Sequence, residues 1–119
     1  LTVFGDGGQT RSFCYVDDMV EAFLRLMEMS DDFSGPVNLG NPAEITVREL
    51  AEKISSVVGY TGKIEWDTSR PDGTPQKLLD VSRLSALGWK AEHDMTAGVE
   101  KTYNWYRDQS PGIGGQGRP

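Results

Sequence analysis

Residues 5–18 read Gly5-Asp6-Gly7-Gly8-Gln9-Thr10-Arg11-Ser12-Phe13-Cys14-Tyr15-Val16-Asp17-Asp18. A glycine-rich turn leads through one arginine into a short apolar run, which ends in two acidic residues that favour a helix start. With the apolar residues Leu1–Phe4 before it, the stretch predicts strand, turn, strand and helix in close succession. A guanidinium held beside flexible backbone is suited to a phosphate group.

The rest of the chain continues this alternation of short strands and helices. We expect strands at Leu1–Phe4, Gln9–Val16, Val37–Gly40 and Lys63–Trp66, an extended piece at Leu78–Val81, and helices at about 18–29, 47–58, 82–88 and 94–107. Asp17, Thr46, Ser82 and Asp94 are the expected N-caps. Thr46 and Glu49 have the spacing of a capping box, and Gly59 should end that helix. The expected fold class is α/β, with short strands alternating with about four helices.

Composition limits the chain to one modest domain without a membrane or nucleic-acid partner. It has 119 residues, of which 37% are hydrophobic and 25% charged, and its formal net charge is −6. An acidic surface repels nucleic acid and anionic lipid, so a phosphate ligand would need local positive charge. No apolar run reaches the roughly 18 residues of a membrane span. One cysteine and one histidine argue against disulfides and a metal site and favour a cytoplasmic protein.

The composition of both ends of the chain is typical of a fragment of a longer protein. Leu1 begins directly in a strand-like run, and residues 109–119 have the glycine-rich composition of a flexible tail. We therefore expect one structural unit over residues 1–108, followed by the tail, and interpret the chain as a fragment of something longer.

The candidate ligand-binding residues are cations. Arg11 follows glycines that allow positive φ, so its turn could form an ordinary hairpin or an anion-binding nest. Arg70 and Lys77 flank a stiff loop with two prolines, which could also be a plain solvated connection. If Arg11 meets one of these cations, the two could clamp a diphosphate.

Other chemically capable residues are assigned to structure. Helix capping explains Asp17 and Asp18, Cys14 is interpreted as a small buried residue, and His93 is expected to be exposed. The chain has neither a Gly-x-Gly-x-x-Gly between strand and helix nor a Tyr-x-x-x-Lys pair. We therefore expect no catalytic, cofactor-binding or metal-binding residue in it.

Several segments in combination resemble the C-terminal part of the extended short-chain dehydrogenase/reductase family, the NAD-dependent nucleotide-sugar epimerases, dehydratases and decarboxylases. The matching segments are Leu1–Gly7, Arg11–Phe13, Tyr15–Asp18, Val37–Asn41, Leu79–Asp80, Leu87–Trp89 and the last helix. Residues 1–54 are most similar to the UDP-glucuronate decarboxylases, and residues 57–106 to the GDP-L-fucose synthases. The latter carry a cation at the position of Lys77, where UDP-sugar enzymes usually have an arginine.

The resemblance implies the small substrate-binding lobe of such an enzyme, with a UDP- or GDP-linked sugar as ligand. A UDP-glucuronate decarboxylase is the first expectation for the whole enzyme, and a GDP-L-fucose synthase is the alternative. In the family, the positions of Thr2, Val3 and Phe4 line the base, and those of Arg11 and Lys77 contact the phosphates. The resemblance also implies that the NAD or NADP site, the catalytic groups and the N-terminal Rossmann domain lie upstream of Leu1. The chain alone is then expected to be inactive.

A second interpretation is a non-catalytic module that self-associates. Without a Rossmann domain, helix faces that carry Met19, Phe23 and Met27 would be exposed, and such faces promote homo-oligomers.

Overall fold

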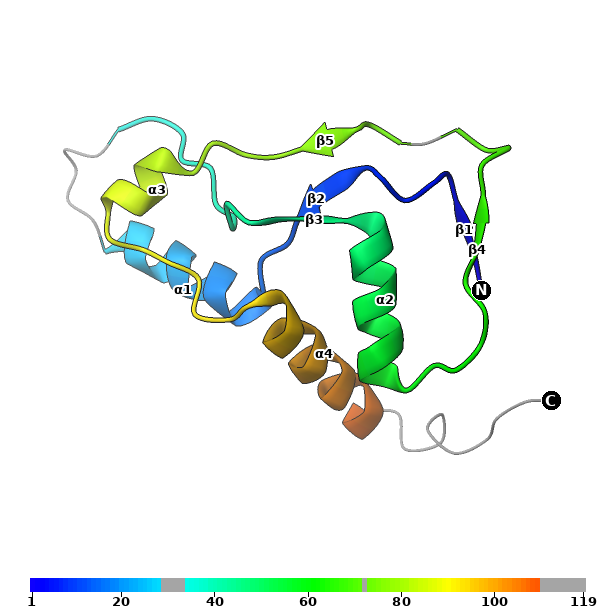
Figure 1. Ribbon diagram of the computed structural model, residues 1–119. Coiled ribbons are helices and arrows are strands. Elements are labelled where there is room, and N and C mark those ends of the chain that lie inside the picture. The colour runs from blue at the N-terminus through cyan, green and yellow to red at the C-terminus, as the bar shows by residue number, and fades with distance from the viewer. Residues whose placement is uncertain (29–33, 72, 110–119) are drawn as a thin grey trace.

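The computed structural model describes residues 1–28, 34–71 and 73–109. Its elements in chain order are β1 (Thr2–Phe4), β2 (Thr10–Ser12), α1 (Val16–Met27), β3 (Glu44–Thr46), α2 (Val47–Val58), β4 (Glu65–Asp67), β5 (Gln76–Lys77), α3 (Ser82–Ala86) and α4 (Met95–Gln109) (Figure 1). The predicted α/β class, with short strands and four helices, is confirmed for the described residues. The predicted tail lies outside them, except for Gln109, which ends α4.

The strands form two small sheets. β1 pairs in parallel with β4, while β2 lies between antiparallel β3 and parallel β5. β1 and β2 therefore do not form the hairpin that the glycine-rich turn allowed. In that turn Gly7 has a φ of 78°, and a Cβ there would lie 2.5 Å from the Trp66 ring. Glycine at this position lets the Trp66 ring pack against the turn.

Helix α2 is the element whose limits follow most directly from local sequence. The Glu49 amide donates to the Thr46 hydroxyl at 3.1 Å, and the Thr46 amide donates to the Glu49 carboxylate at 2.9 Å. These bonds are the predicted capping box, and they hold the pKa of Glu49 below its ordinary value. Gly59 follows the helix in the left-handed conformation, with a φ of 70°.

Two other helix starts differ from the sequence expectation. Helix α1 begins at Val16, with Tyr15 at the N-cap position and no capping side chain, so Asp17 lies inside the first turn. Helix α3 follows Val81, and its first amide, that of Ser82, donates to the Asp80 carboxylate at 2.9 Å. Asp80 takes the role predicted for Ser82 because its side chain, two residues earlier, reaches that amide.

One strand expectation is wrong. No strand forms at 37–40 within the described residues, whereas residues 78–81 follow the two-residue strand β5 outside any helix or strand. Val37 and Leu39 pack against the small core instead of entering a sheet. A β-strand needs a neighbouring strand to pair with, and an apolar segment alone does not supply one.

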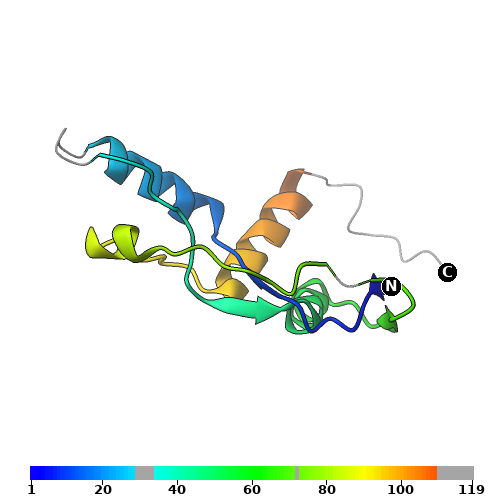
Figure 2. The ribbon, with the colours of Figure 1, turned by 90° about the horizontal axis from the view of Figure 1, so that it is seen from above.

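The core is small and lies around α1, α3 and the segment that leads to α4. Its buried members are Ala22, Val81, Leu84 and Trp89. The radius of gyration is 17.7 Å, whereas a compact domain of this length has about 13–14 Å. Figure 2 shows the reason, because the elements spread along the molecule, whose extents are 59 × 37 × 16 Å.

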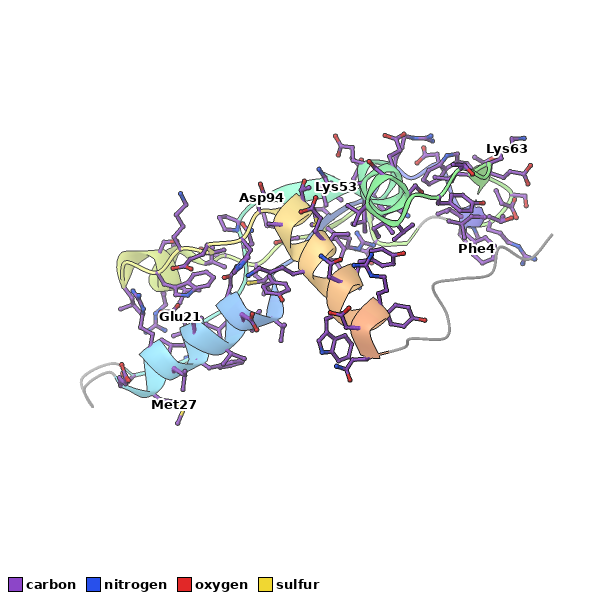
Figure 3. The ribbon with its side chains drawn as sticks, turned by 90° about the horizontal axis from the view of Figure 1, so that it is seen from below. Phe4, Glu21, Met27, Lys53, Lys63 and Asp94 are labelled. Atoms are coloured by element: carbon purple, nitrogen blue, oxygen red, sulfur yellow. The ribbon has the colours of Figure 1, made fainter. Side chains whose placement is uncertain are left out.

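Helix α1 leaves much of its apolar surface uncovered. Ala22 is buried and Met19 half-buried, but Phe23 is 52% and Met27 81% exposed, and Figure 3 shows Met27 pointing outward from the end of α1. Such a face is typical of one that another protein surface covers. In the described part of the chain, the helices are too short or too polar to cross a membrane.

Candidate functional site

The structure places Arg11 and Lys77 at facing positions of adjacent strands. They are paired in the register between β2 and β5. Paired residues of neighbouring strands point to the same face of a sheet, so the two cationic side chains share one face. Sixty-six positions separate them in the sequence, and the register of this sheet brings them together.

The loop that leads to β5 passes beside the Arg11 guanidinium. Arg11 is half-buried, and its Nη1 donates to the Thr10 carbonyl at 2.5 Å. A Cβ built on Gly73 would lie 3.2 Å from Arg11 Nη2, so the backbone of the loop approaches the guanidinium closely. Within residues 1–28, 34–71 and 73–109, neither Arg11 nor Lys77 has a carboxylate within 4.0 Å. No carboxylate of the described residues therefore neutralises either cation.

The opposite face of this sheet carries a carboxylate. Glu44, on β3, accepts a hydrogen bond from the Thr10 hydroxyl through Oε1 and one from the Gln76 amide group through Oε2, both at 2.7 Å. Side chains alternate between faces along a strand, so Glu44 lies away from Arg11 and Lys77. The sheet thus separates one negative charge from two positive ones.

The other predicted site residues lie on the β1–β4 sheet. Thr2 and Phe4 are exposed on one face, whereas Val3 is half-buried and points to the other face with its register partner Trp66. The Arg70 guanidinium carbon lies 5.7 Å from the centre of the Phe4 ring. Arg70 and Gly73 are three residues apart, which spans at most about 11 Å of chain. This loop therefore connects the surroundings of Phe4 with those of Arg11.

Sequence reasoning missed the contact between Asp18 and His93. Asp18 is 5% exposed; it accepts from the His93 amide at 3.1 Å, and its other oxygen lies 2.7 Å from His93 Nδ1. His93 Nε2 lies 2.6 Å from Lys101 Nζ. An ammonium group only donates, so Nε2 accepts and Nδ1 carries the proton that is donated to Asp18. Asp18 is thus no cap, and His93 is half-buried rather than exposed.

The contact between Asp18 and His93 makes the stability of the fold depend on pH in the acidic range. Burial alone would raise the pKa of Asp18, but the hydrogen bonds from the His93 ring and amide outweigh it, so that pKa lies below its ordinary value of 3.8. A carboxyl group whose pKa is lower in the folded than in the unfolded state stabilises the fold above the unfolded-state pKa. That contribution is lost as the pH falls through the folded-state pKa.

We therefore expect Asp18→Asn to lower the free energy of unfolding at pH 7 by about 1–3 kcal/mol, the usual range for a hydrogen-bonded charged group. It should also reduce the loss of stability between pH 5 and pH 2.5. Urea unfolding followed by circular dichroism measures both quantities, with the exposed neighbour variant Asp17→Asn as control. Equal stability of Asp18→Asn and the parent chain at pH 7 would contradict this assignment.

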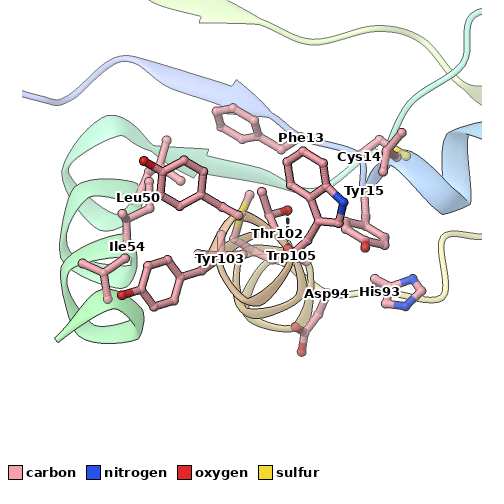
Figure 4. Close-up of a pocket in the computed structure, with 16 residues that line it drawn as sticks. Phe13, Cys14, Tyr15, Leu50, Ile54, His93, Asp94, Thr102, Tyr103 and Trp105 are labelled. Atoms are coloured by element: carbon pink, nitrogen blue, oxygen red, sulfur yellow. Dashed lines mark hydrogen bonds between the residues drawn. The ribbon is translucent and has the colours of Figure 1, made fainter. Parts of the chain in front are cut away.

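A separate hollow of about 660 Å³ lies between α2 and α4, bounded by the segment before α1. Figure 4 shows Leu50 and Ile54 of α2 on the side of Tyr103 of α4, while Trp105 of α4 lies toward Tyr15 and Phe13 of the segment before α1. This apolar lining suits other apolar side chains better than a phosphorylated ligand.

Comparison with known proteins shows similarity to one family of enzymes. The model of the NAD dependent epimerase/dehydratase family matches residues 1–40. Putative GDP-L-fucose synthase 2 of Arabidopsis thaliana is 44% identical over 106 residues, which cover 89% of this chain and 32% of that protein. UDP-glucuronic acid decarboxylase 3 of the same plant is 42% identical over 100 residues, 83% of this chain and 29% of that protein. UDP-glucose 4-epimerase from Thermotoga maritima, solved with UDP-glucose, has a TM-score of 0.80 at 28% identity, covering 92% of this chain and 35% of its own.

The chain is similar to NAD-dependent epimerase/dehydratase family proteins over most of its length, and the family model itself matches residues 1–40. It spans about a third of the length of the curated relatives that it matches. Similarity to both enzyme groups is confirmed, and each extends over most of the chain, whereas the expected division between residues 1–54 and 57–106 stays a prediction.

The glycine turn of this chain does not fit the dinucleotide cofactor NAD that the name of the matching family implies. The turn leads into a strand, and two of its amides are engaged: Gly5 donates to the Asp67 carbonyl at 2.9 Å and Gly8 to the Asp6 carboxylate at 2.6 Å. The first amides of α2 donate back to the turn's carbonyls. A dinucleotide site needs free amides at a helix start beside such a turn. The same bonds argue against the anion-nest interpretation.

Proposed function

We propose that this chain supplies the nucleotide and diphosphate contacts of an NAD-dependent nucleotide-sugar enzyme. The observation that carries the proposal is the register of Arg11 and Lys77 on one face of the sheet. The hydride chemistry of the whole enzyme would depend on NAD or NADP and on a Rossmann domain outside this chain. The chain's own part is to bind and orient the substrate.

The two cations would divide the diphosphate between them. The planar guanidinium of Arg11 can form two parallel hydrogen bonds to one phosphate, whereas the Lys77 ammonium acts as a mobile point charge on the other. The net charge of −6 repels anions at long range, so binding depends on this local pair. With Arg11 half-buried, its charge is less screened by salt than an exposed one.

Thr2, Val3 and Phe4 would lie beside the base. Phe4 is 59% exposed, and Arg70 already lies over its ring. A nucleobase can stack on an aromatic ring or on a guanidinium plane. The loop from Arg70 to Lys77 then runs along the nucleotide from the base to the diphosphate.

We favour a GDP-linked sugar, as in GDP-L-fucose synthase, over a UDP-linked one. The support is the 44% identity to that enzyme across 89% of the chain and the lysine at position 77. The identity of 42% to a UDP-glucuronic acid decarboxylase supports the UDP alternative.

Titration of the ¹⁵N-labelled chain with GDP and with UDP tests the proposal. We expect saturable shifts of the Phe4, Arg11 and Lys77 amides, at lower concentration for GDP. A folded chain without saturable shifts at millimolar concentrations of both nucleotides would contradict it.

Self-association remains the second candidate, favoured by the exposed apolar face of α1. The face consists of Val16, Val20, Phe23, Leu24 and Met27, each at least 50% exposed. Light scattering over a range of concentrations separates the two candidates, because this one requires a mass above 13.1 kDa that falls in Phe23→Glu. A monomer at high concentration would contradict it.

A further inference from the structure

The two-residue strand β5 holds Lys77 in place, yet little fixes β5 itself. Within the described residues its one sheet neighbour is β2. Both of its side chains are exposed. At its start, the Thr10 amide donates to the Pro75 carbonyl at 2.8 Å. A strand this short gains little from pairing alone, so other contacts have to keep β5 against β2.

Glu44 supplies such a contact across the whole sheet. Its register partner on β2 is Ser12, but its carboxylate reaches diagonally to Thr10, on the same face. Its second oxygen passes beyond β2 to the Gln76 amide group on β5. One carboxylate therefore connects all three strands, from β3 over the central strand to β5.

We propose that Glu44 is a positioning residue, which holds β5 against β2 from the far face and so keeps Lys77 beside Arg11. The inference rests on the proposed diphosphate site, because the two cations matter together only if one ligand contacts both. Gln76 precedes Lys77 directly, so its bond to Glu44 fixes the backbone that carries the lysine.

The direction of the effect distinguishes this role from simple electrostatics. Removal of a negative charge near two cations would strengthen anion binding through space. Loss of the connection between the strands would weaken it, because Lys77 would no longer be held in place. Glu44→Ala is expected to weaken GDP binding by about three- to tenfold, less than the loss of a charged group that contacts the ligand directly, because Glu44 acts only through the position of β5. Glu52→Ala, which removes an equally charged and exposed side chain on α2, should leave binding unchanged or slightly tighter.

Swapping the side chains at positions 44 and 76 should restore the contact between β3 and β5. Gln76→Glu alone places two carboxylates against each other and should loosen β5 at least as much as Glu44→Ala. The double variant Glu44→Gln/Gln76→Glu restores one carboxylate and one amide group at the same net charge. It should return GDP affinity to within about twofold of the parent chain, since the two effects are coupled.

Hydrogen exchange of the Thr10 amide measures the docking of β5 without any ligand. Exchange should accelerate in Glu44→Ala and Gln76→Glu and return toward the parent rate in the double variant. Unchanged exchange in Glu44→Ala, or tighter GDP binding by it, would overturn the positioning role. If exchange responds as expected but the parent chain binds neither GDP nor inorganic pyrophosphate, the positioning role stands and the proposed function fails.

Discussion

Arg11→Ala is expected to weaken GDP binding by about 10- to 150-fold, the equivalent of 1.5–3 kcal/mol for a hydrogen-bonded charged group. Arg11 is half-buried and has no carboxylate within 4.0 Å in the described part of the chain. Its loss therefore removes a charge that no carboxylate of the described residues neutralises. Isothermal titration calorimetry measures the affinity.

Arg25→Ala is the matched control. Arg25 is an exposed arginine on α1, where it forms an ion pair with Glu21, so its loss should change GDP affinity by less than about twofold. Lys77→Ala should weaken binding less than Arg11→Ala, because a mobile ammonium loses more entropy on binding. The double variant should lose less than the sum of the two single effects if both cations bind the same diphosphate. Full additivity would argue for separate roles.

Leu84→Ala is expected to lower the free energy of unfolding by about 2–5 kcal/mol, the usual cost of a buried leucine truncated to alanine. Leu84 is 1% exposed and is the largest fully buried side chain in the described structure. Within the described residues it packs with the buried Ala22, Val81 and Trp89, and only partly buried apolar residues surround this cluster.

Leu24→Ala provides the comparison for this variant. Leu24 is 55% exposed on α1, and alanine favours a helix, so the same truncation there should cost less than about 1 kcal/mol. Urea unfolding followed by circular dichroism measures both. Similar losses in the two variants would show that the small cluster around Leu84 does not stabilise the fold.

The features that the sequence predicts well are local ones. Thr46 and Glu49 lie three residues apart, and the capping box, the limits of α2 and the Gly59 stop all follow from contacts within one turn of chain. Asp94 likewise caps α4 as predicted, because the Ala97 amide lies three residues on, 2.8 Å from its carboxylate. Such interactions form whatever the rest of the fold does.

The features that the sequence missed depend on distant residues. Asp18 lies in the first turn of α1, where acidic residues are common. Its side chain nevertheless contacts His93, 75 residues away, and no local sequence pattern predicts that contact. Val37 and Leu39 read as a strand but have no strand beside them in the described structure. For the candidate site, the sequence supplied the two cations and the family resemblance, whereas the pairing of Arg11 with Lys77 required the sheet register.

The central claim is that Arg11 and Lys77 together bind the diphosphate of a nucleotide, and the affinity ratio of GDP to GMP tests it most directly. The two ligands share base, ribose and α-phosphate, so their ratio isolates the β-phosphate. We expect the parent chain to bind GDP at least about tenfold more tightly than GMP, as one charge-assisted hydrogen bond provides, and the ratio to fall to about one in Arg11→Ala/Lys77→Ala. An equal ratio in the parent chain and the double variant would contradict the claim.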